Sequence, residues 1–290
     1  MERPESLAAR LRRRARPLQA AARLGFQIES NWSDPMVFVV YALAKPLATS
    51  LILLVMYKVI VGGGTSDPRF VALYVGNALY SYVLLLLVGL SWAIFEDRES
   101  YRMLKYVAMA PMGLVAYLLG RSWAKFVLAT LSAGVVLGFG VVVLGMRLAS
   151  DPAALARFGA ITLVGAAGVA AVGLVLAGCA MIFARQSMTM NEGTSAILYL
   201  LCGVVFPPDL LPRVLHPVAL ALPVTWWLEA SRRVLGARGF SPLLAQWPDA
   251  SLAAIFLGVT ALWVAFALLA FSRFERRARA LGLLDVTTAW

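Results

Sequence analysis

The sequence predicts an all-α integral membrane protein, and three observations support this prediction. Of its 290 residues, 61% are hydrophobic and 14% are charged, whereas a soluble domain is about 45–50% apolar. The apolar surplus lies in long blocks. A helix needs roughly 20 predominantly apolar residues to cross a bilayer. Six blocks fit this requirement, the fifth being the shortest: about 36–60, 70–95, 113–146, 158–184, 191–206 and 251–272.

An arginine cluster precedes the first block. Residues 7–24, LAARLRRRARPLQAAARL, have the pattern of a basic amphipathic helix on the anionic inner leaflet, interrupted at Pro17. The alternative is a mobile basic tail that only sets topology. The run 25–34 would form an elbow into the first span. The predicted division is 1–34 for the interfacial N-terminal helix, 35–272 for a six-span domain and 273–290 for a cytoplasmic tail.

Basic residues indicate how the spans are oriented. If both termini are cytoplasmic, most arginines and lysines face the cytoplasm, as the positive-inside rule requires. They lie in residues 3–23, 98–125, 185 and 273–279. Because they flank apolar blocks, the net charge of +11 does not point to nucleic acid as a partner. We therefore expect a multi-pass protein of the inner or plasma membrane of a prokaryotic cell, in contact with membrane lipids.

Polar residues recur every four positions on three of the spans, which places them on one helical face. On the first span, burying the charge of Lys45 in the bilayer would cost free energy. Two interpretations avoid this cost: Lys45 belongs to a polar stripe that faces a translocation cavity, or its side chain snorkels to the inner headgroups. On the second span Asn77 needs a partner, for which an interhelical hydrogen bond is expected before substrate contact. The candidate substrate path comprises Tyr41, Lys45, Thr49, Asn77, Ser81, Asn191, Ser195 and Tyr199.

The third block is longer than one span requires and has two basic residues near its start. Arg121 and Lys125 are four positions apart, and we expect the helix to begin below the bilayer so that both reach cytosol or headgroups. Glycines in this block and the next provide small surfaces for close helix packing. Gly134 and Gly138 form a GxxxG pair, whose expected use is packing against neighbouring helices of the same chain.

Between the second and third spans lies a charged, helix-prone segment, EDRESYRMLKYVAMAPM, at residues 96–112. Its acidic end leads and its basic end follows, an order that suits the helix dipole and a contact between Glu99 and Arg102. Pro111 would end this helix. The orientation places the segment in the cytoplasm, where it reads as a docking element for a partner protein.

The stretch 204–248 does not fit a plain span, because prolines interrupt an apolar run. Two short helices that dip back into the outer leaflet fit it, provided that protein covers their broken backbone. Trp226 and Trp227 would lie at the outer interface, and Glu229 can pair with Arg232 or Arg233. The candidate residues of this external re-entrant region are Pro207, Pro212, Pro223, Glu229 and Arg232.

Patterns for catalysis, metal binding and phosphate binding are absent from the sequence. The one histidine, His216, lies in the proline-rich stretch, and the carboxylates considered fall in loops or at block ends. No catalytic residue, metal site or buried proton relay is therefore expected. No G-x-x-x-x-G-K-[ST] motif is present. If ATP drives this protein, a partner chain binds ATP and Mg²⁺, and this chain has no cofactor.

Together these features resemble the membrane subunit of ABC-2 type transporters, which export drugs, lipids, cell-wall polymers and glycolipids. The resemblance covers the six-span layout from about residue 25 to the C-terminus and rests on two motifs. After the second span the matching residues are Glu96, Glu99, Arg102, Leu104, Ala110 and Pro111, with Ser100 and Tyr101 where family members often carry Gly-Thr. In the proline-rich stretch they are Pro207, Leu211, Pro212, Pro223, Thr225, Glu229 and Arg232.

The resemblance implies a dimer of permeases, identical or related, on a dimer of separate ATPase subunits. It also implies export of a hydrophobic or amphiphilic substrate from the cytoplasm or inner leaflet. The segment after the second span would be the coupling helix, seated in an ATPase cleft through Glu96, Glu99, Arg102, Met103 and Lys105. The rival functions are an ATP-independent channel or assembly scaffold, and a membrane-embedded lipid or glycosyl transferase. The transferase needs a convergent catalytic site, which the scattered carboxylates do not supply.

Overall fold

The computed structural model describes residues 7–30, 35–62 and 64–285, with the side chains of residues 7–15, 30, 35–43 and 61 excepted. In this part of the chain we find helices and turns but no strand. The first half comprises α1 (Leu7–Ser30), α2 (Pro35–Val61), α3 (Pro68–Tyr82), η1 (Val83–Leu87), α4 (Val88–Glu99), α5 (Leu104–Met109) and α6 (Leu114–Val142). The second half comprises α7 (Pro152–Ile182), η2 (Ala184–Gln186), α8 (Ser187–Leu201), η3 (Pro208–Leu210), η4 (Arg213–Leu215), α9 (His216–Ala221), α10 (Pro223–Val234), α11 (Pro242–Ala245) and α12 (Asp249–Ala280).

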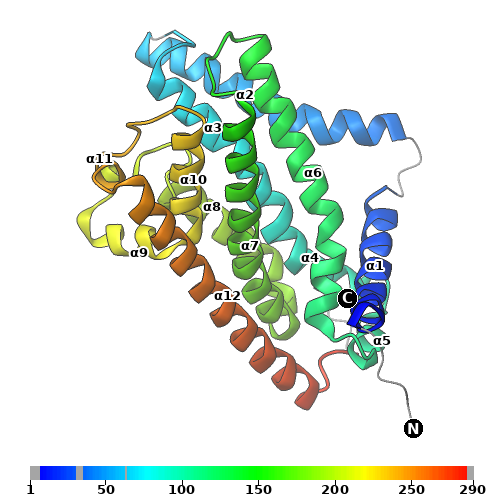
Figure 1. Cartoon of the computed structure of the whole chain (residues 1–290). Helices are drawn as coiled ribbons and strands as arrows, with labels where there is room; N and C mark the ends of the chain where they lie inside the picture. Colours follow the sequence, from blue (N-terminus) through cyan, green and yellow to red (C-terminus); the bar gives the residue numbers. More distant parts are fainter. Residues whose placement is uncertain (1–6, 31–34, 63, 286–290) are drawn as a thin grey trace.

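Four helical units in the described residues are long and apolar enough to cross a membrane. They are the continuous run of α3, η1 and α4, then α6, α7 and α12. These units correspond to the predicted second, third, fourth and sixth spans. They lie roughly side by side, with α5 and the end of α12 at one end of the molecule (Figure 1). We call this end, which also holds the termini of α4 and α7, the α5 end.

The remaining two predicted spans correspond to α2 and α8. The 15 residues of α8 give about 22 Å of helix at 1.5 Å per residue, which is shorter than the hydrocarbon core of about 30 Å. In Figure 1, α2 lies across the end of the bundle opposite α5 rather than alongside the other helices. The total of six spans therefore stays a prediction.

Two of the long units begin with the same capping arrangement. Asp67 accepts a hydrogen bond from the backbone N–H of Arg69, and Asp151 accepts one from Ala154. A proline follows each aspartate at the first helical position, where its missing N–H costs nothing. The Asp67 carboxylate also accepts a 2.5 Å hydrogen bond from the Tyr57 hydroxyl of α2, and these bonds lower the pKa of Asp67. Both starts are thus determined locally.

The second span is not a uniform α-helix. Residues Val83–Leu87 form a π-helical turn, η1, between α3 and α4. Gly173 of α7 packs against this turn so closely that a Cβ there would lie 2.9 Å from Leu87 Cα. A π turn widens the helix by one residue and is a common cause of a kink. The contact with α7 therefore occurs where the helix of the second span is irregular.

Helix α7 packs against its neighbours through glycines, as the sequence predicts for this block. A Cβ on Gly165 would lie 2.3 Å from the Trp227 ring, and one on Gly168 would lie 2.9 Å from Pro223. Trp227 is fully buried and Trp226 is 3% exposed. The expectation that these tryptophans lie at an outer interface is therefore wrong, because the glycines of α7 leave room for the indole inside the bundle.

The GxxxG pair of α6 behaves in the opposite way. Gly134 and Gly138 are exposed, and a Cβ on either would have no atom within 4 Å. The expectation that this pair packs inside the chain is wrong. The glycine that α6 does use is Gly140, whose Cβ would meet the Tyr74 ring of α3 at 2.7 Å. Spacing alone does not tell which face of a helix turns inward.

Helix α1 runs beside α6 at the right of Figure 1. It continues through Pro17 and covers most of the expected elbow, so both sequence expectations for this segment need correction. Its inner face packs on α6: a Cβ on Gly25 would lie 2.5 Å from the Arg121 carbonyl oxygen, and one on Gly120 would lie 2.6 Å from Ala21 Cβ. A proline inside a helix tends to break it, but α1 stays continuous through Pro17 where it packs against α6. Its described outer face exposes Arg16, Arg23 and Phe26.

The proline-rich stretch forms five short helical pieces, from η3 to α11. Its backbone is broken, as predicted, and protein covers it only in part, because Pro223 is buried whereas Pro212 is exposed. Arg232 anchors the buried part. The Arg232 guanidinium is 1% exposed and donates hydrogen bonds to the carbonyls of Ala72, Gly203 and Val204. It therefore joins α10 to α3 and to Gly203 and Val204, which lie just after the end of α8. Of the two arginines that the sequence offers as partners of Glu229, Arg233 forms the ion pair, at 2.9 Å.

Substituting Gly165 by alanine tests the packing of α7 on Trp227. Overpacking a core costs about 1–3 kcal/mol, and alanine regains about 1 kcal/mol of helix propensity. Because a buried indole cannot give way, we expect Gly165→Ala to destabilise the detergent-solubilised protein by up to about 2 kcal/mol in thermal unfolding. The matched control is Gly159→Ala on the same helix, where a Cβ meets nothing. Equal stability of the two variants would contradict this packing.

Candidate functional site

The charged segment 96–112 is not one helix. Helix α4 ends at Glu99, a turn follows, and α5 begins at Leu104. Arg102 lies in this turn with φ of 50°, in the left-handed region that is uncommon for residues other than glycine. The expected contact between Glu99 and Arg102 on one helix face is therefore wrong. The end of α5 at Met109 agrees with the stop predicted at Pro111.

The turn between α4 and α5 is fastened to the last residues of α4. The backbone N–H groups of Ser100 and Tyr101 both donate to the Glu96 carbonyl at 2.9 Å, and that of Met103 donates to the Asp97 carbonyl at 2.7 Å. These bonds satisfy carbonyls that a helix end leaves without partners. The turn is short and bonded in this way, so α5 is held directly to the end of α4.

A buried ion cluster lies directly beneath this turn. The Arg121 guanidinium of α6 contacts the Asp97 carboxylate and forms a 2.5 Å ion pair with Glu96. Glu96 also accepts a hydrogen bond from the Trp92 indole at 2.9 Å. Asp97 is completely buried and Arg121 is 2% exposed. A buried charge is costly unless paired, so this cluster links the end of α4 to α6.

Two expectations about α6 are corrected here. Arg121 does not reach cytosol or headgroups, because it is buried against α4. Lys125 reaches only as far as α1, where it forms an ion pair with Glu29. Asp97 is a site residue that sequence reasoning missed. The available signal was a carboxylate at the end of one span together with an arginine at the start of the next, which a short connection brings to the same end.

Arg98 is a second residue that sequence reasoning missed. It is 3% exposed and donates to the Ala180 and Met181 carbonyls at the end of α7. Its Nε contacts the Glu99 carboxylate at 2.9 Å. Glu99, singled out from the sequence for docking, is therefore engaged within the chain. Nothing in the spacing of Arg98 along the sequence indicates a partner more than 80 residues away.

Helix α5 has one buried and one exposed face. Leu104 and Ala108 pack into the bundle, whereas Tyr106 and Met109 are 63% and 71% exposed. Tyr101, in the preceding turn, is 49% exposed. Large apolar and aromatic side chains grouped on one surface are typical of a protein interface. We call Tyr101, Tyr106 and Met109 the α5 face.

The last turn of α12 and the segment that follows it contact α5. Arg279 donates to the Ala108 carbonyl at 2.8 Å, and Lys105 forms a 2.6 Å ion pair with Asp285. The Asp285 carboxylate raises the pKa of Lys105. Of the predicted coupling residues, Lys105 is thus held by the C-terminal segment, while Met103 is half-buried and Arg102 is exposed.

The candidate path residues lie around α3 rather than on one shared surface. Asn77 donates to the Ser50 hydroxyl of α2 at 3.3 Å, which is the interhelical bond expected. The Tyr80 hydroxyl donates to the Ser195 carbonyl, and its ring packs edge-on against Tyr199. The Ser81 hydroxyl is bonded to the Ala78 carbonyl of its own helix.

Other path residues are more dispersed. Lys45 and Thr49 are exposed on α2, and the Thr49 hydroxyl donates to the Lys45 carbonyl. Asn191 is 3% exposed, and neither polar atom of its side chain has a partner among the described residues. The side chain of Tyr41 lies outside the described residues. The structure thus gathers part of the predicted set around α3 and leaves the α2 residues apart.

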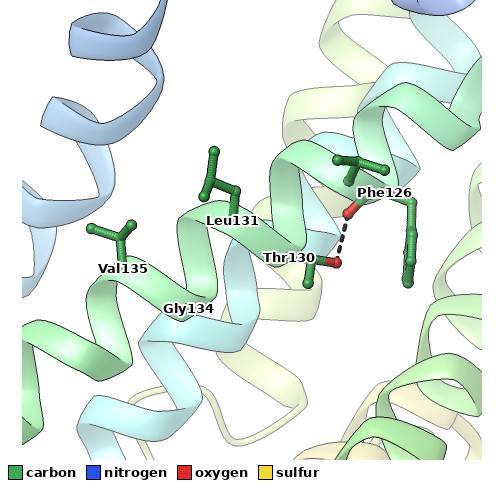
Figure 2. Close-up of a pocket in the computed structure, with 6 residues that line it drawn as sticks. Phe126, Thr130, Leu131, Gly134 and Val135 are labelled. Atoms are coloured by element: carbon green, nitrogen blue, oxygen red, sulfur yellow. Dashed lines mark hydrogen bonds between the residues drawn. The ribbon is translucent and has the colours of Figure 1, made fainter.

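An apolar groove of about 530 Å³ follows the outward face of α6. Figure 2 shows its labelled residues on α6, with the Thr130 hydroxyl bonded to the Phe126 carbonyl. Gly134 is one of its lining residues. None of the candidate path residues whose side chains the structure describes lines this groove. An apolar outward face is what a membrane helix presents to lipid tails.

No cluster of three or more metal-ligating side chains occurs among the residues searched, which are those that the structure describes. His216 is half-buried and its Nε2 lies 3.0 Å from the Leu211 carbonyl oxygen, a local contact within the proline-rich stretch. The buried charged groups at the α5 end are paired with one another or with backbone carbonyls. This arrangement holds helices together and presents a surface, as a docking site does.

Comparison with known protein families places the chain. Residues 19–235 match the family model described as ABC-2 type transporter, which runs from within α1 to the residue after α10. It therefore includes the ion cluster, the α5 face and Arg232. A search of the curated proteins finds no match.

The ion cluster can be tested by removing one partner and then both. Removing one member of a buried ion pair costs about 3–5 kcal/mol, whereas replacing both by apolar residues is often neutral. We expect Arg121→Met to lower the unfolding free energy by that amount, and Arg121→Met with Asp97→Leu to recover most of it. Thermal unfolding in detergent measures both. The control, Arg157→Met on exposed α7 surface, should change stability by less than about 0.5 kcal/mol. A double variant as unstable as Arg121→Met alone would refute the pairing.

Proposed function

Because the chain belongs to the ABC-2 type transporter family, we propose that it is the permease subunit of an ATP-driven exporter. It is a membrane protein and a permease of an ABC transporter, whose energy comes from a separate ABC ATPase component. The proposal adds that the substrate is hydrophobic or amphiphilic and leaves from the cytoplasm or inner leaflet. ATP and Mg²⁺ would bind to the ATPase, so this chain needs no cofactor of its own.

The observation that carries this proposal is the α5 face. It exposes two tyrosines and a methionine on a turn and a short helix, which are bonded to the end of a membrane-spanning unit. A partner that pushes on this face pushes on a span. This is the property that a coupling helix needs, and it supports α5 with its preceding turn as the coupling element, together with Arg102, Met103 and Lys105.

The mechanism follows from how α5 is attached. Closure of the ATPase dimer on ATP would displace α5, and α4 would move with it because the turn between them is short and three of its backbone N–H groups are bonded to the end of α4. The ion cluster would carry this displacement to α6. Tilting of these helices would then open a path between two permease subunits, which are identical or related chains.

The distribution of basic residues supports an α5 end in the cytoplasm, with both termini on that side. Described arginines exposed near this end include Arg16, Arg23 and Arg102. In this orientation α1 lies at the inner surface, with its exposed arginines available to anionic lipid headgroups. The proline-rich stretch, with Pro207, Pro212 and Pro223, would then form the external re-entrant region of a prokaryotic inner or plasma membrane protein.

The substrate path in this proposal uses the polar residues around α3, with Lys45 of α2 at its edge. A lysine exposed on a membrane helix favours substrates that carry an anionic group. Asn191, buried without a partner in the described chain, supplies an amide that a substrate or water can satisfy when the helices separate. The favoured cargo is thus an anionic amphiphile.

Introducing charge on the α5 face tests docking. We expect Tyr106→Asp with Met109→Asp to lower the amount of ATPase that co-purifies with the permease by at least tenfold, because two carboxylates would be buried in an apolar contact. The readout is the ratio of ATPase to permease after affinity purification of the co-expressed subunits.

The matched control is Leu210→Asp, which changes a side chain that is 71% exposed in the proline-rich stretch. It should leave the ratio unchanged. If the α5 variant retains the ATPase as well as the control does, docking does not use this face. If the unmodified chain transports at full rate with no ATPase present, the proposal as a whole is wrong.

Replacing Lys45 tests the substrate class. In proteoliposomes that contain the assembled complex, we expect Lys45→Met to reduce ATP-dependent movement of a fluorescent phosphatidylglycerol by about tenfold, a loss that corresponds to roughly 1.4 kcal/mol. Movement of a zwitterionic fluorescent phosphatidylcholine serves as the internal comparison and should change less than twofold. Equal effects on the transport of both lipids, or no effect on either, would contradict the proposal that the substrate carries an anionic group.

A further inference from the structure

We propose that Arg98 is a positioning residue that fastens the α5 end of α4 to the end of α7, so that a displacement of α5 is passed to α7. The inference rests on the proposed function, since it assumes that α5 receives the movement of the ATPase. It adds a residue that belongs to neither of the two motifs by which the sequence resembles the family.

The geometry of Arg98 is that of a helix cap supplied by another helix. Its Nη1 donates to the carbonyl oxygens of Ala180 at 3.3 Å and Met181 at 3.2 Å. These carbonyls belong to the last turn of α7, which ends at Ile182. Such carbonyls have no partner within their own helix and carry the negative end of the helix dipole. A cation placed there stabilises the helix end and holds it in place.

Burial makes this contact more than an incidental surface bond. The side chains of Arg98 and Glu99 are 2% and 4% exposed, and their ion pair measures 2.9 Å. The Glu99 carboxylate thus compensates the Arg98 charge and orients the guanidinium toward α7. One guanidinium nitrogen, Nη2, has no partner among the described residues. A planar guanidinium can contact a carboxylate and two carbonyls at once, whereas a lysine ammonium has a single nitrogen.

Arg98 stands between the parts that must move together. The residues on either side of it, Asp97 and Glu99, end the helix to which the turn and α5 are bonded. On the other side, α7 packs closely against Trp227 through Gly165 and against Phe274 through Gly178. A push on α5 that reaches α7 is therefore passed to α10 and α12. Without the polar contact, α4 and α7 would be held mainly by apolar packing, which specifies relative position less strictly.

The chain contains a matched arginine at the opposite end. Arg232 is also buried, and it also donates to carbonyls near a helix end, those of Gly203 and Val204 after α8. It has no contact with α5 or its turn. Substitution of Arg232 therefore reproduces the structural loss of a buried helix-capping arginine without affecting the link between α5 and α7.

The experiment measures the distance between the turn that joins α4 to α5 and the end of α7. Spin labels are attached at Ser100→Cys and Phe183→Cys, both exposed positions outside the α5 face, in a background in which Cys179 and Cys202 are alanine. Electron paramagnetic resonance distance distributions are recorded for the full-length permease alone and for its complex with the co-expressed ATPase, without nucleotide and after trapping with ATP and vanadate. The variants compared are the unsubstituted labelled chain, Arg98→Lys and Arg232→Lys.

We expect a narrow distribution for the labelled chain that keeps its width in every state, and at least a twofold wider one for Arg98→Lys. Arg232→Lys should keep the narrow width even if its thermal stability falls. If Arg98→Lys does not fold, Glu99→Gln provides the same test, with an intermediate broadening expected because Arg98 loses its orienting charge.

Two results would overturn the inference: an unchanged width in Arg98→Lys, or equal broadening in Arg98→Lys and Arg232→Lys, which would mean a general structural role. Failure of the unsubstituted chain to retain any ATPase would instead refute the proposed function. The distance measured in the isolated permease would still decide whether Arg98 fastens α4 to α7.

Discussion

The rest of the structure depends on the requirement that charges buried at the α5 end be paired. Moving an ion out of water costs several kcal/mol unless a partner and hydrogen bonds replace the solvent. Asp97 and Arg121 are both buried and meet this requirement together, while Arg98 meets it with Glu99 and the carbonyls of α7. The end of α4 therefore has one position relative to α6 and α7, and the surface carried by α5 is fixed as a result.

Small residues provide the second constraint, which acts along the length of the bundle. Helices in a membrane gain little from excluding water between them, so close packing and interhelical hydrogen bonds hold them together. Along α7, Gly165, Gly173 and Gly178 each admit a large group or a backbone of another helix. The polar anchors lie at the two ends, at Arg98 and at Arg232, and the π turn η1 lies in the middle of the span between them. The bundle thus has firmly joined ends and an irregular centre.

Much of the fold could be predicted from the sequence, and the candidate site only in outline. The apolar blocks identified the four long spans, whereas the caps at Asp67 and Asp151 that begin two of them were found only in the structure. The predicted docking segment does expose an apolar surface, but its helix is broken at Glu99 and its key charges turn inward. Arg121 was expected at the headgroups and lies in the core instead. The expectation failed because helical spacing tells which residues share a face and does not tell what that face meets.

By itself, the sequence determined four membrane-spanning helices and the class of protein, because these depend on the local composition of long apolar segments. Only the tertiary structure decided which buried charges are paired, which glycines face inward and which part of α5 is exposed. Arg98 and Ala180 lie 82 positions apart, and Gly134 and Gly140 differ only in the neighbour that each face meets. Such contacts form when helices pack, and packing depends on the shape and charge of all the faces together rather than on any one segment.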